Sequence, residues 1–163
     1  MKKKINNSLE LYFSNTFPYK SFKKSKKSNT VTVCIGGNIG DVSKRFKKLF
    51  LAFKSDSRFS LMQTSPLLKN PPFGYTEQED FLNGIMIFKT NLSPMECLRA
   101  FQRYEHRFQR VRSFQDAPRT LDIDIIFFNN LKMKSVVLTL PHHGYKNRDS
   151  VLIPLKYVNN NIN

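Results

Sequence analysis

Two kinds of hydrophobic pattern alternate along the chain. Short runs of β-branched and aromatic residues predict strands, and segments with an apolar residue at every third or fourth position predict helices with one apolar face. Strands are expected at residues 30–35, 59–67, 81–88, 121–128 and 136–140. The segments at 69–80 and 110–119 are expected to be loops, since the first contains Pro71-Pro72 and Gly74 and the second is polar and arginine-rich.

Capping residues mark where two helices begin. Asp41 can cap the first helix, and Ser93 and Glu96 form a capping box around Pro94 at the start of the second. The apolar positions with helical spacing that follow are Phe46, Leu49, Phe50 and Phe53 in the first helix and Leu98, Phe101, Tyr104 and Phe108 in the second. A short helical turn is expected at 150–156.

The resulting order, β-α-β-β-α-β with additions, predicts an α+β protein of ferredoxin-like architecture, an antiparallel sheet with helices packed on it. Residues 1–29 are expected to be a basic N-terminal extension. Its apolar part can pack on the domain, and its lysine run at 23–27 is expected to be a mobile linker. The domain proper is expected at 30–157, followed by a disordered C-terminal tail at 158–163.

Composition changes this picture mainly through charge. The 163 residues are 40% hydrophobic, enough for a packed core, and carry a net charge of +15. Residues 1–30 contain eight lysines and one glutamate, so about half of that charge lies in the extension, where a lysine-rich solvated surface explains it. In the rest of the chain, arginines cluster near two aspartates, which indicates a site for an anionic ligand.

No apolar run is long enough to cross a bilayer, and no secretion signal follows the basic N-terminus, so we expect a cytoplasmic protein without membrane contact. Cys34 and Cys97 are expected to be buried thiols, although the sequence leaves a disulfide between them open.

The segment 121–128 reads as a buried strand, yet it contains Asp122 and Asp124. Residues two apart in a strand point to the same face, roughly 7 Å apart along the chain. The two carboxylates therefore project together, and Leu121, Ile123 and Ile125 face the other way. A divalent cation would remove their mutual repulsion, but ion pairs with nearby arginines are the commoner arrangement for an isolated Asp-X-Asp.

The neighbouring residues favour the metal. Arg110, Arg112 and Arg119 precede the strand, and Pro141-His142-His143, Lys146 and Arg148 follow the next one. Arginine binds phosphate through paired hydrogen bonds, so carboxylates surrounded by cations suit phosphoryl transfer with magnesium. The chain has no Walker A motif, which excludes a P-loop enzyme.

Four sequence blocks resemble the 6-hydroxymethyl-7,8-dihydropterin pyrophosphokinase family of folate biosynthesis. They are Gly36-Gly37-Asn38-Ile39-Gly40-Asp41, Pro71-Pro72-Phe73-Gly74 leading to Asp80-Phe81-Leu82-Asn83, Arg119-Thr120-Leu121-Asp122-Ile123-Asp124-Ile125, and Leu140-Pro141-His142 leading to Asn147-Arg148. The resemblance covers about residues 30–157. It implies transfer of pyrophosphate from ATP to the pterin hydroxymethyl group, with AMP as the other product.

The resemblance also implies roles for individual residues. Asp122 and Asp124 would hold two magnesium ions, Arg110 and Arg119 would engage the phosphates, and Asp124 is the candidate to accept the hydroxyl proton. Positions matching ATP contacts are Gln102, Glu105, Arg112, Ile125, Thr139, His142, His143 and Arg148. Positions matching pterin contacts are Asn70, Pro71, Phe73, Phe81 and Asn83. Without the resemblance, Phe81 would be assigned to core packing and Asn83 to a turn.

The chain departs from the family pattern at three places. Gly37 stands where serine is usual. The arginine-rich loop is one residue short and has Phe114-Gln115-Asp116 where an aromatic and a further basic residue often occur. Ser150 lies where a second aromatic often stacks on the pterin, and Phe114 or Tyr145 is the candidate substitute.

Two other functions share features with this sequence. An RNA-binding module would fit the fold, the charge and the many phenylalanines, but no RNP-like block is present and the carboxylates would repel phosphate without metal. A palm-type nucleotidyltransferase shares the two-carboxylate logic but would release pyrophosphate. We therefore expect a monomer that binds ATP and the pterin and does not bind nucleic acid.

Overall fold

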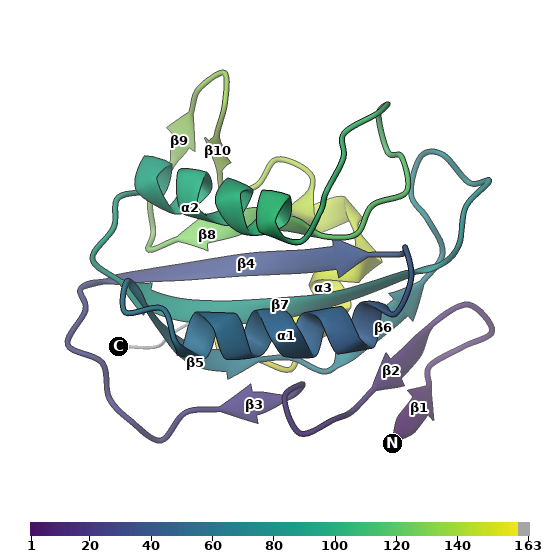
Figure 1. The fold of residues 1–163 in the computed structure, drawn as a ribbon, viewed down its shortest axis with the longest axis horizontal. Coiled ribbons are helices and arrows are strands. Elements are labelled where there is room, and N and C mark those ends of the chain that lie inside the picture. The colour runs from purple at the N-terminus through teal and green to yellow at the C-terminus, as the bar shows by residue number, and fades with distance from the viewer. Residues whose placement is uncertain (160–163) are drawn as a thin grey trace.

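The structure contains the antiparallel sheet that the hydrophobic pattern predicts, enlarged at one side by strands of the extension (Figure 1). The computed structural model describes residues 1–159. Its elements are β1 (Lys2–Lys4), β2 (Glu10–Tyr12), β3 (Tyr19–Lys20), β4 (Asn29–Gly37), α1 (Val42–Lys54), β5 (Phe59–Thr64), β6 (Leu67–Asn70), β7 (Phe81–Thr90), α2 (Pro94–Arg107), β8 (Asp122–Phe128), β9 (Met133–Lys134), β10 (Thr139–Leu140), the 3-10 turn η1 (Tyr145–Asn147) and α3 (Asp149–Leu155).

Strand β4 lies between β7 and the edge strand β8. The strand order is β1-β2-β6-β7-β4-β8, while β5 also pairs with β7 and β3 pairs with β5. The register places Gly36 of β4 opposite Asn83 of β7 on one side and opposite Asp122 of β8 on the other. Asn83, Gly36 and Asp122 therefore form one row across three strands.

Helices cover both faces of the sheet, and each face has its own core. Helices α1 and α2 lie in front of the sheet in Figure 1 and α3 lies behind it. The larger core contains Ile123 and Ile125 of β8 together with Phe46 and Phe101 from the two front helices. The smaller core, on the α3 side, includes Cys34, Ile85, Ile87, Ile126 and Val151. The predicted α+β, ferredoxin-like architecture is confirmed.

Both predicted helix starts are present with their capping hydrogen bonds. The Asp41 carboxylate accepts the backbone N–H of Lys44 at 3.0 Å. Ser93 and Glu96 form the reciprocal capping box, with the backbone N–H of Ser93 donating to Glu96 Oε2 at 2.7 Å. Polar capping residues thus fix where each helix begins.

Two strand predictions need correction. The expected strand at 59–67 is interrupted, because Pro66 has no N–H to donate and the Ser65 hydroxyl accepts the Ile85 N–H at 2.8 Å. Strand β6 then continues through Asn70, so the loop begins at residue 71 instead of 69. The expected strand at 136–140 is confirmed only at its end, where β10 covers Thr139–Leu140. Val136 and Val137 are exposed in the turn between β9 and β10.

The N-terminal extension packs on the domain through its apolar residues, as expected. Leu11 of β2 is fully buried, and the Phe17 ring lies 6.2 Å from the Phe46 ring and 6.1 Å from the Phe50 ring, centre to centre. Residues 21–28 form neither helix nor strand.

At the other end, Val158 packs on the smaller core and the Asn159 N–H donates to Gln63 Oε1 at 3.1 Å. Residues 160–163 of the predicted tail lie outside the described residues.

The two cysteines are free and buried, as predicted. Burial raises the pKa of the Cys97 thiol to about 12. Within residues 1–159, no helix has the length and apolar content needed to cross a membrane.

Candidate active site

The two aspartates of β8 project to the face opposite the larger core, as the alternation predicts. Asp122 is buried, and Asp124 is partly exposed. Burial together with the charges of Asp122 and Glu105 raises the pKa of Asp124 to about 7. Three carboxylates thus concentrate negative charge here, and their hard oxygen ligands fit a cation such as magnesium. No group of three or more His, Cys, Asp or Glu side chains within residues 1–159 is arranged to hold a metal, so the two aspartates would rely on substrate and water for further ligands.

Arg119 contacts both a carboxylate and an aromatic ring of this region. Its Nε donates to Asp122 Oδ2, and its guanidinium carbon lies 4.5 Å from the centre of the Phe81 ring. The ion pair that the simpler interpretation of Asp-X-Asp predicts therefore exists for Asp122. In the described part of the chain, the Asp124 carboxylate has no hydrogen bond or ion pair of its own.

Two side-chain amides lie beside the aspartates. Asn83 Nδ2 donates to Asn70 Oδ1 at 2.7 Å, and Asn70 Nδ2 donates to the Pro71 carbonyl at 2.9 Å. A Cβ on Gly36 would lie 2.5 Å from Asn83 Oδ1 and 2.6 Å from Asp122 Oδ1. Gly36 thus leaves the space in which the amide and the carboxylate flank one another. Gly36 stands in the first of the four blocks, but the sequence does not show which residues of other strands lie beside it, so this contact could not be found from the sequence.

The loop arginines meet α2 at a buried glutamate. Glu105 Oε1 accepts hydrogen bonds from Arg110 Nη1 at 2.7 Å and from the Ile123 N–H at 2.9 Å, and its Oε2 lies 3.4 Å from Arg112 Nη2. Burial raises the pKa of Glu105, and these donors oppose the shift. Arg110 Nε is buried without a hydrogen-bond partner among the described residues. A cavity of about 340 Å³ is lined by Gln102, Glu105, His106, Arg110 and Arg112.

The segment that follows β10 contacts strand β8 through its backbone. The His142 N–H donates to the Ile126 carbonyl at 3.0 Å, and the rings of His142 and His143 are stacked 4.7 Å apart. Burial and the nearby charges of His143 and Arg148 lower the pKa of His142 to about 4, so its ring is neutral at pH 7. Its Nδ1 accepts the Gly144 N–H at 3.1 Å.

The remaining predicted residues occupy different surroundings. Thr139 belongs to β10, which contacts β8. The Arg148 guanidinium lies 5.0 Å from the centre of the exposed Phe73 ring. The Ile125 side chain is buried in the larger core, so only its backbone is available to a ligand.

The structure shows which groups surround Gly37, Phe114 and Tyr145, the residues connected with the departures from the family pattern. A Cβ on Gly37 would lie 2.5 Å from the Thr120 carbonyl oxygen, so a serine there requires the backbone before β8 to shift. Phe114 packs edge-on against Tyr75 at 5.2 Å, and Tyr145 packs edge-on against Phe127 at 5.0 Å. Phe114 remains exposed, whereas Tyr145 joins the smaller core.

Sequence reasoning missed a set of amides that connects the loops around the site. Asn38 Nδ2 donates to Gln78 Oε1 at 2.8 Å, and Gln78 Nε2 donates to the Asp116 carbonyl at 2.8 Å. Asn38 Oδ1 accepts the Arg119 N–H at 3.0 Å. Contacts between irregular segments leave no periodic signal, although Asn38 stands in the first of the four blocks.

The family model described as 7,8-dihydro-6-hydroxymethylpterin-pyrophosphokinase (HPPK) matches residues 32–160. The chain is 44% identical over 148 residues to the 2-amino-4-hydroxy-6-hydroxymethyldihydropteridine pyrophosphokinase of Helicobacter pylori, covering 90% of this chain and 91% of that one. It is 39% identical over 142 residues to the protein of that name from Campylobacter jejuni, covering 87% and 90%. It is 33% identical over 132 residues to the folic acid synthesis protein fol1 of Schizosaccharomyces pombe, covering 81% of this chain and 18% of that one.

Proposed function

Because the chain belongs to the 7,8-dihydro-6-hydroxymethylpterin-pyrophosphokinase family, we propose which of its residues bind the substrates and carry the reaction. The enzyme transfers pyrophosphate to 6-hydroxymethyl-7,8-dihydropterin in folate synthesis, with ATP as co-substrate. In this reaction the pterin hydroxyl oxygen bonds to the β-phosphorus of ATP. The bond from that phosphorus to the oxygen shared with the α-phosphate breaks, AMP leaves, and the hydroxyl proton is released.

The row formed by Asn83, Gly36 and Asp122 is the observation that carries the assignment. It places an amide that can read the donor and acceptor edge of a pterin next to a carboxylate that can hold a cation. Phe81 and Phe73 supply aromatic faces for the ring, and Asn70 and Pro71 extend the polar edge. The hydroxymethyl group would then point toward β8.

Asp122 and Asp124 would hold magnesium, and we propose two ions, as in the family. Magnesium, when bound, neutralises charge on the triphosphate and orients it for in-line transfer. Arg119 must release the Asp122 oxygen that it contacts here, and its guanidinium is then free to bind phosphate.

ATP is placed along α2 and β8. Gln102, Glu105 and Arg112 border the cavity of about 340 Å³, and the buried, unpartnered Nε of Arg110 supports a phosphate contact for that side chain. Thr139, His142, His143, Arg148 and the backbone of Ile125 complete the proposed ATP contacts. The neutral ring of His142 favours a hydrogen-bonding role over a charge contact.

We further propose that the protein works as a cytoplasmic monomer and does not bind nucleic acid. Cations around an anionic substrate account for part of its positive charge outside the extension. Gel filtration of the full chain with light scattering measures the mass directly.

Product analysis tests the function. The wild-type protein with ATP, magnesium and 6-hydroxymethyl-7,8-dihydropterin should give AMP and the pterin diphosphate in equal amounts.

Asp122→Asn and Asp124→Asn keep side-chain size and should lower kcat by about 1000-fold or more, since the electrostatic contribution of a bound metal is several kcal/mol. Asp41→Asn removes the same charge at a helix cap and should retain activity. Release of pyrophosphate would instead indicate a nucleotidyltransferase, and undiminished activity of either β8 variant would refute the metal assignment.

A further inference from the structure

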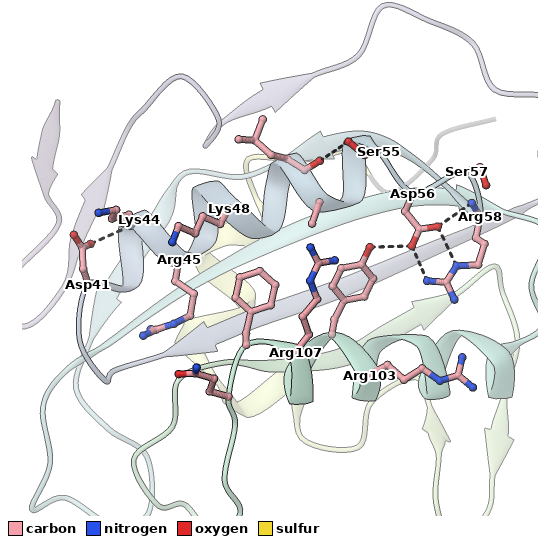
Figure 2. A pocket seen from close by; sticks show the side chains of 15 residues that line it. Asp41, Lys44, Arg45, Lys48, Ser55, Asp56, Ser57, Arg58, Arg103 and Arg107 are labelled. Atoms are coloured by element: carbon pink, nitrogen blue, oxygen red, sulfur yellow. Dashed lines mark hydrogen bonds and ion pairs between the residues drawn. The ribbon is translucent and has the colours of Figure 1, made fainter.

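A second concave region lies between α1 and α2, across the sheet from the aspartates (Figure 2). This groove has a volume of about 1200 Å³, more than the range of 300–1,000 Å³ typical of small-molecule pockets. None of the residues assigned to the pterin, ATP or magnesium lines it. Its function is therefore not explained by the active site.

Unpaired cations line both walls of the groove. Lys44 and Lys48 stand one turn apart on α1, and Arg103 and Arg107 stand one turn apart on α2. All four are exposed, and within residues 1–159 none of them forms an ion pair. Like charges at this spacing destabilise a helix. A bound anion would remove this cost on both helices.

The acidic side chains of the groove already have partners. The Asp41 carboxylate caps α1. Asp56 accepts two hydrogen bonds from the Arg58 side chain, at 2.9 and 2.7 Å, and one from the Tyr104 hydroxyl at 2.8 Å. Arg58 therefore balances the charge of Asp56, and Asp41 alone is left to oppose Lys44, Arg45, Lys48, Arg103 and Arg107. The groove keeps a net positive charge.

The floor of the groove is apolar and aromatic. The two helices meet through Phe53 and Tyr104, whose ring centres lie 4.2 Å apart, and Tyr104 is among the residues that line the groove. Leu51, Ala52 and Phe108 add apolar surface. Figure 2 shows Arg107 reaching from α2 toward α1. The Arg107 guanidinium carbon lies 5.9 Å from the centre of the Tyr104 ring. Cations that bind phosphate thus lie next to a surface that suits a flat base.

We propose that this groove is a second anion site that binds a nucleoside polyphosphate, with Lys44, Lys48, Arg103 and Arg107 holding the phosphates and the floor contacting the base. The phosphates need not be bound through magnesium, because the two carboxylates among the residues that line the groove are used by the cap of α1 and by the ion pair with Arg58. The site is separate from the active site, so its occupation and turnover can be measured independently.

The test uses amide NMR spectra of the full chain in EDTA. Titration of the wild-type protein with inorganic tripolyphosphate should shift the amide signals of Lys44, Lys48, Arg103 and Arg107 in a saturable way, and ATP should shift the signals of Tyr104 and Phe108 in addition. Lys48→Glu with Arg107→Glu should weaken the binding at these signals at least tenfold while kcat stays within twofold of wild type. Lys132→Glu with Lys134→Glu makes the same charge change on the exposed β9 region and should change the affinity less than twofold. If the first pair does not fold, Lys48→Gln with Arg107→Gln replaces it.

Three results would overturn the proposal. Tripolyphosphate that shifts only active-site signals would show that the groove binds no phosphate. Equal weakening by the two charge-reversal pairs would show attraction by net charge alone. A single-stranded oligouridine that binds the groove at least tenfold more tightly than ATP would assign the surface to nucleic acid instead of a nucleotide.

Discussion

The guanidinium carbon of Arg119 lies 4.5 Å from the centre of the Phe81 ring, while the Nε of the same side chain donates to Asp122. One arginine therefore covers both the aromatic face proposed for the pterin and a carboxylate proposed for magnesium. On the proposed assignment, Arg119 would leave both contacts before its guanidinium binds the phosphates.

Replacing Arg119 by alanine should separate binding from turnover. We expect kcat to fall by about 1000-fold, the lower end of the range for an arginine that stabilises phosphoryl transfer. Affinity for a non-hydrolysable ATP analogue should change less than about threefold, and pterin affinity should not fall, because Phe81 is uncovered. Steady-state kinetics and pterin fluorescence titration measure these quantities.

Arg119→Lys is the matched control that retains the charge but not the fork of donors. A fall in ATP affinity as large as the fall in kcat would contradict the assignment.

Gly36→Ala should disrupt the row of Asn83 and Asp122. The new Cβ would lie about 2.5 Å from one side-chain oxygen and 2.6 Å from the other, so both side chains must move. We expect kcat/KM for the pterin to fall by about 100-fold or more, as for a reacting group displaced by about 1 Å. Gly144→Ala is the control, since its Cβ would meet no atom closer than 3.4 Å. A Gly36→Ala enzyme with wild-type kinetics would remove the row from the mechanism.

Glu105→Gln should free the arginine-rich loop. Glutamine can still accept the Ile123 N–H, but it no longer offers a charge to Arg110 and Arg112. Trypsin cleavage after these two arginines should become several times faster, measured by mass spectrometry of timed digests. Glu79→Gln, an exposed loop position, should leave the cleavage rate unchanged. Equal cleavage of the Glu105→Gln and wild-type loops would show that Glu105 does not restrain them.

Stability should depend on pH through Asp56. The Arg58 side chain, and to a smaller extent Tyr104, lowers the pKa of Asp56 below its ordinary value. A depressed pKa stabilises the folded state at pH values above about 4, and the contribution is lost as pH falls through the lowered pKa. Asp56→Asn should therefore lower the free energy of unfolding by about 1 kcal/mol at pH 7, a modest figure because Arg58 is largely exposed to solvent.

Urea unfolding at pH 7, 5 and 3 measures this effect. The difference between Asp56→Asn and wild type should shrink toward pH 3. Asp80→Asn, whose ion pair with Lys69 is longer and more exposed, should show a smaller difference at pH 7. A deficit of Asp56→Asn that is constant over the whole range would exclude the ionisation as its cause.

The sequence predicts local features well where a few neighbouring residues determine them. The caps at Asp41 and Ser93 and the shared face of Asp122 and Asp124 depend on spacing within one element. The contact of Arg119 with Phe81, and the clearance at Gly36, depend on side chains from different strands, which no periodicity encodes. Val136 and Val137 misled the strand prediction because their β-branched side chains lie exposed in a turn.

Strands β1 and β2 form one border of the sheet. A strand at the border of a sheet offers unpaired N–H and C=O groups on which another chain can assemble. Strand β2 covers that border of β6, Leu11 anchors it opposite Leu68, and the outermost strand, β1, consists of three exposed lysines. Charge repulsion between such strands opposes edge-to-edge pairing. The lysines of β1 thus oppose edge-to-edge aggregation at this border of the sheet.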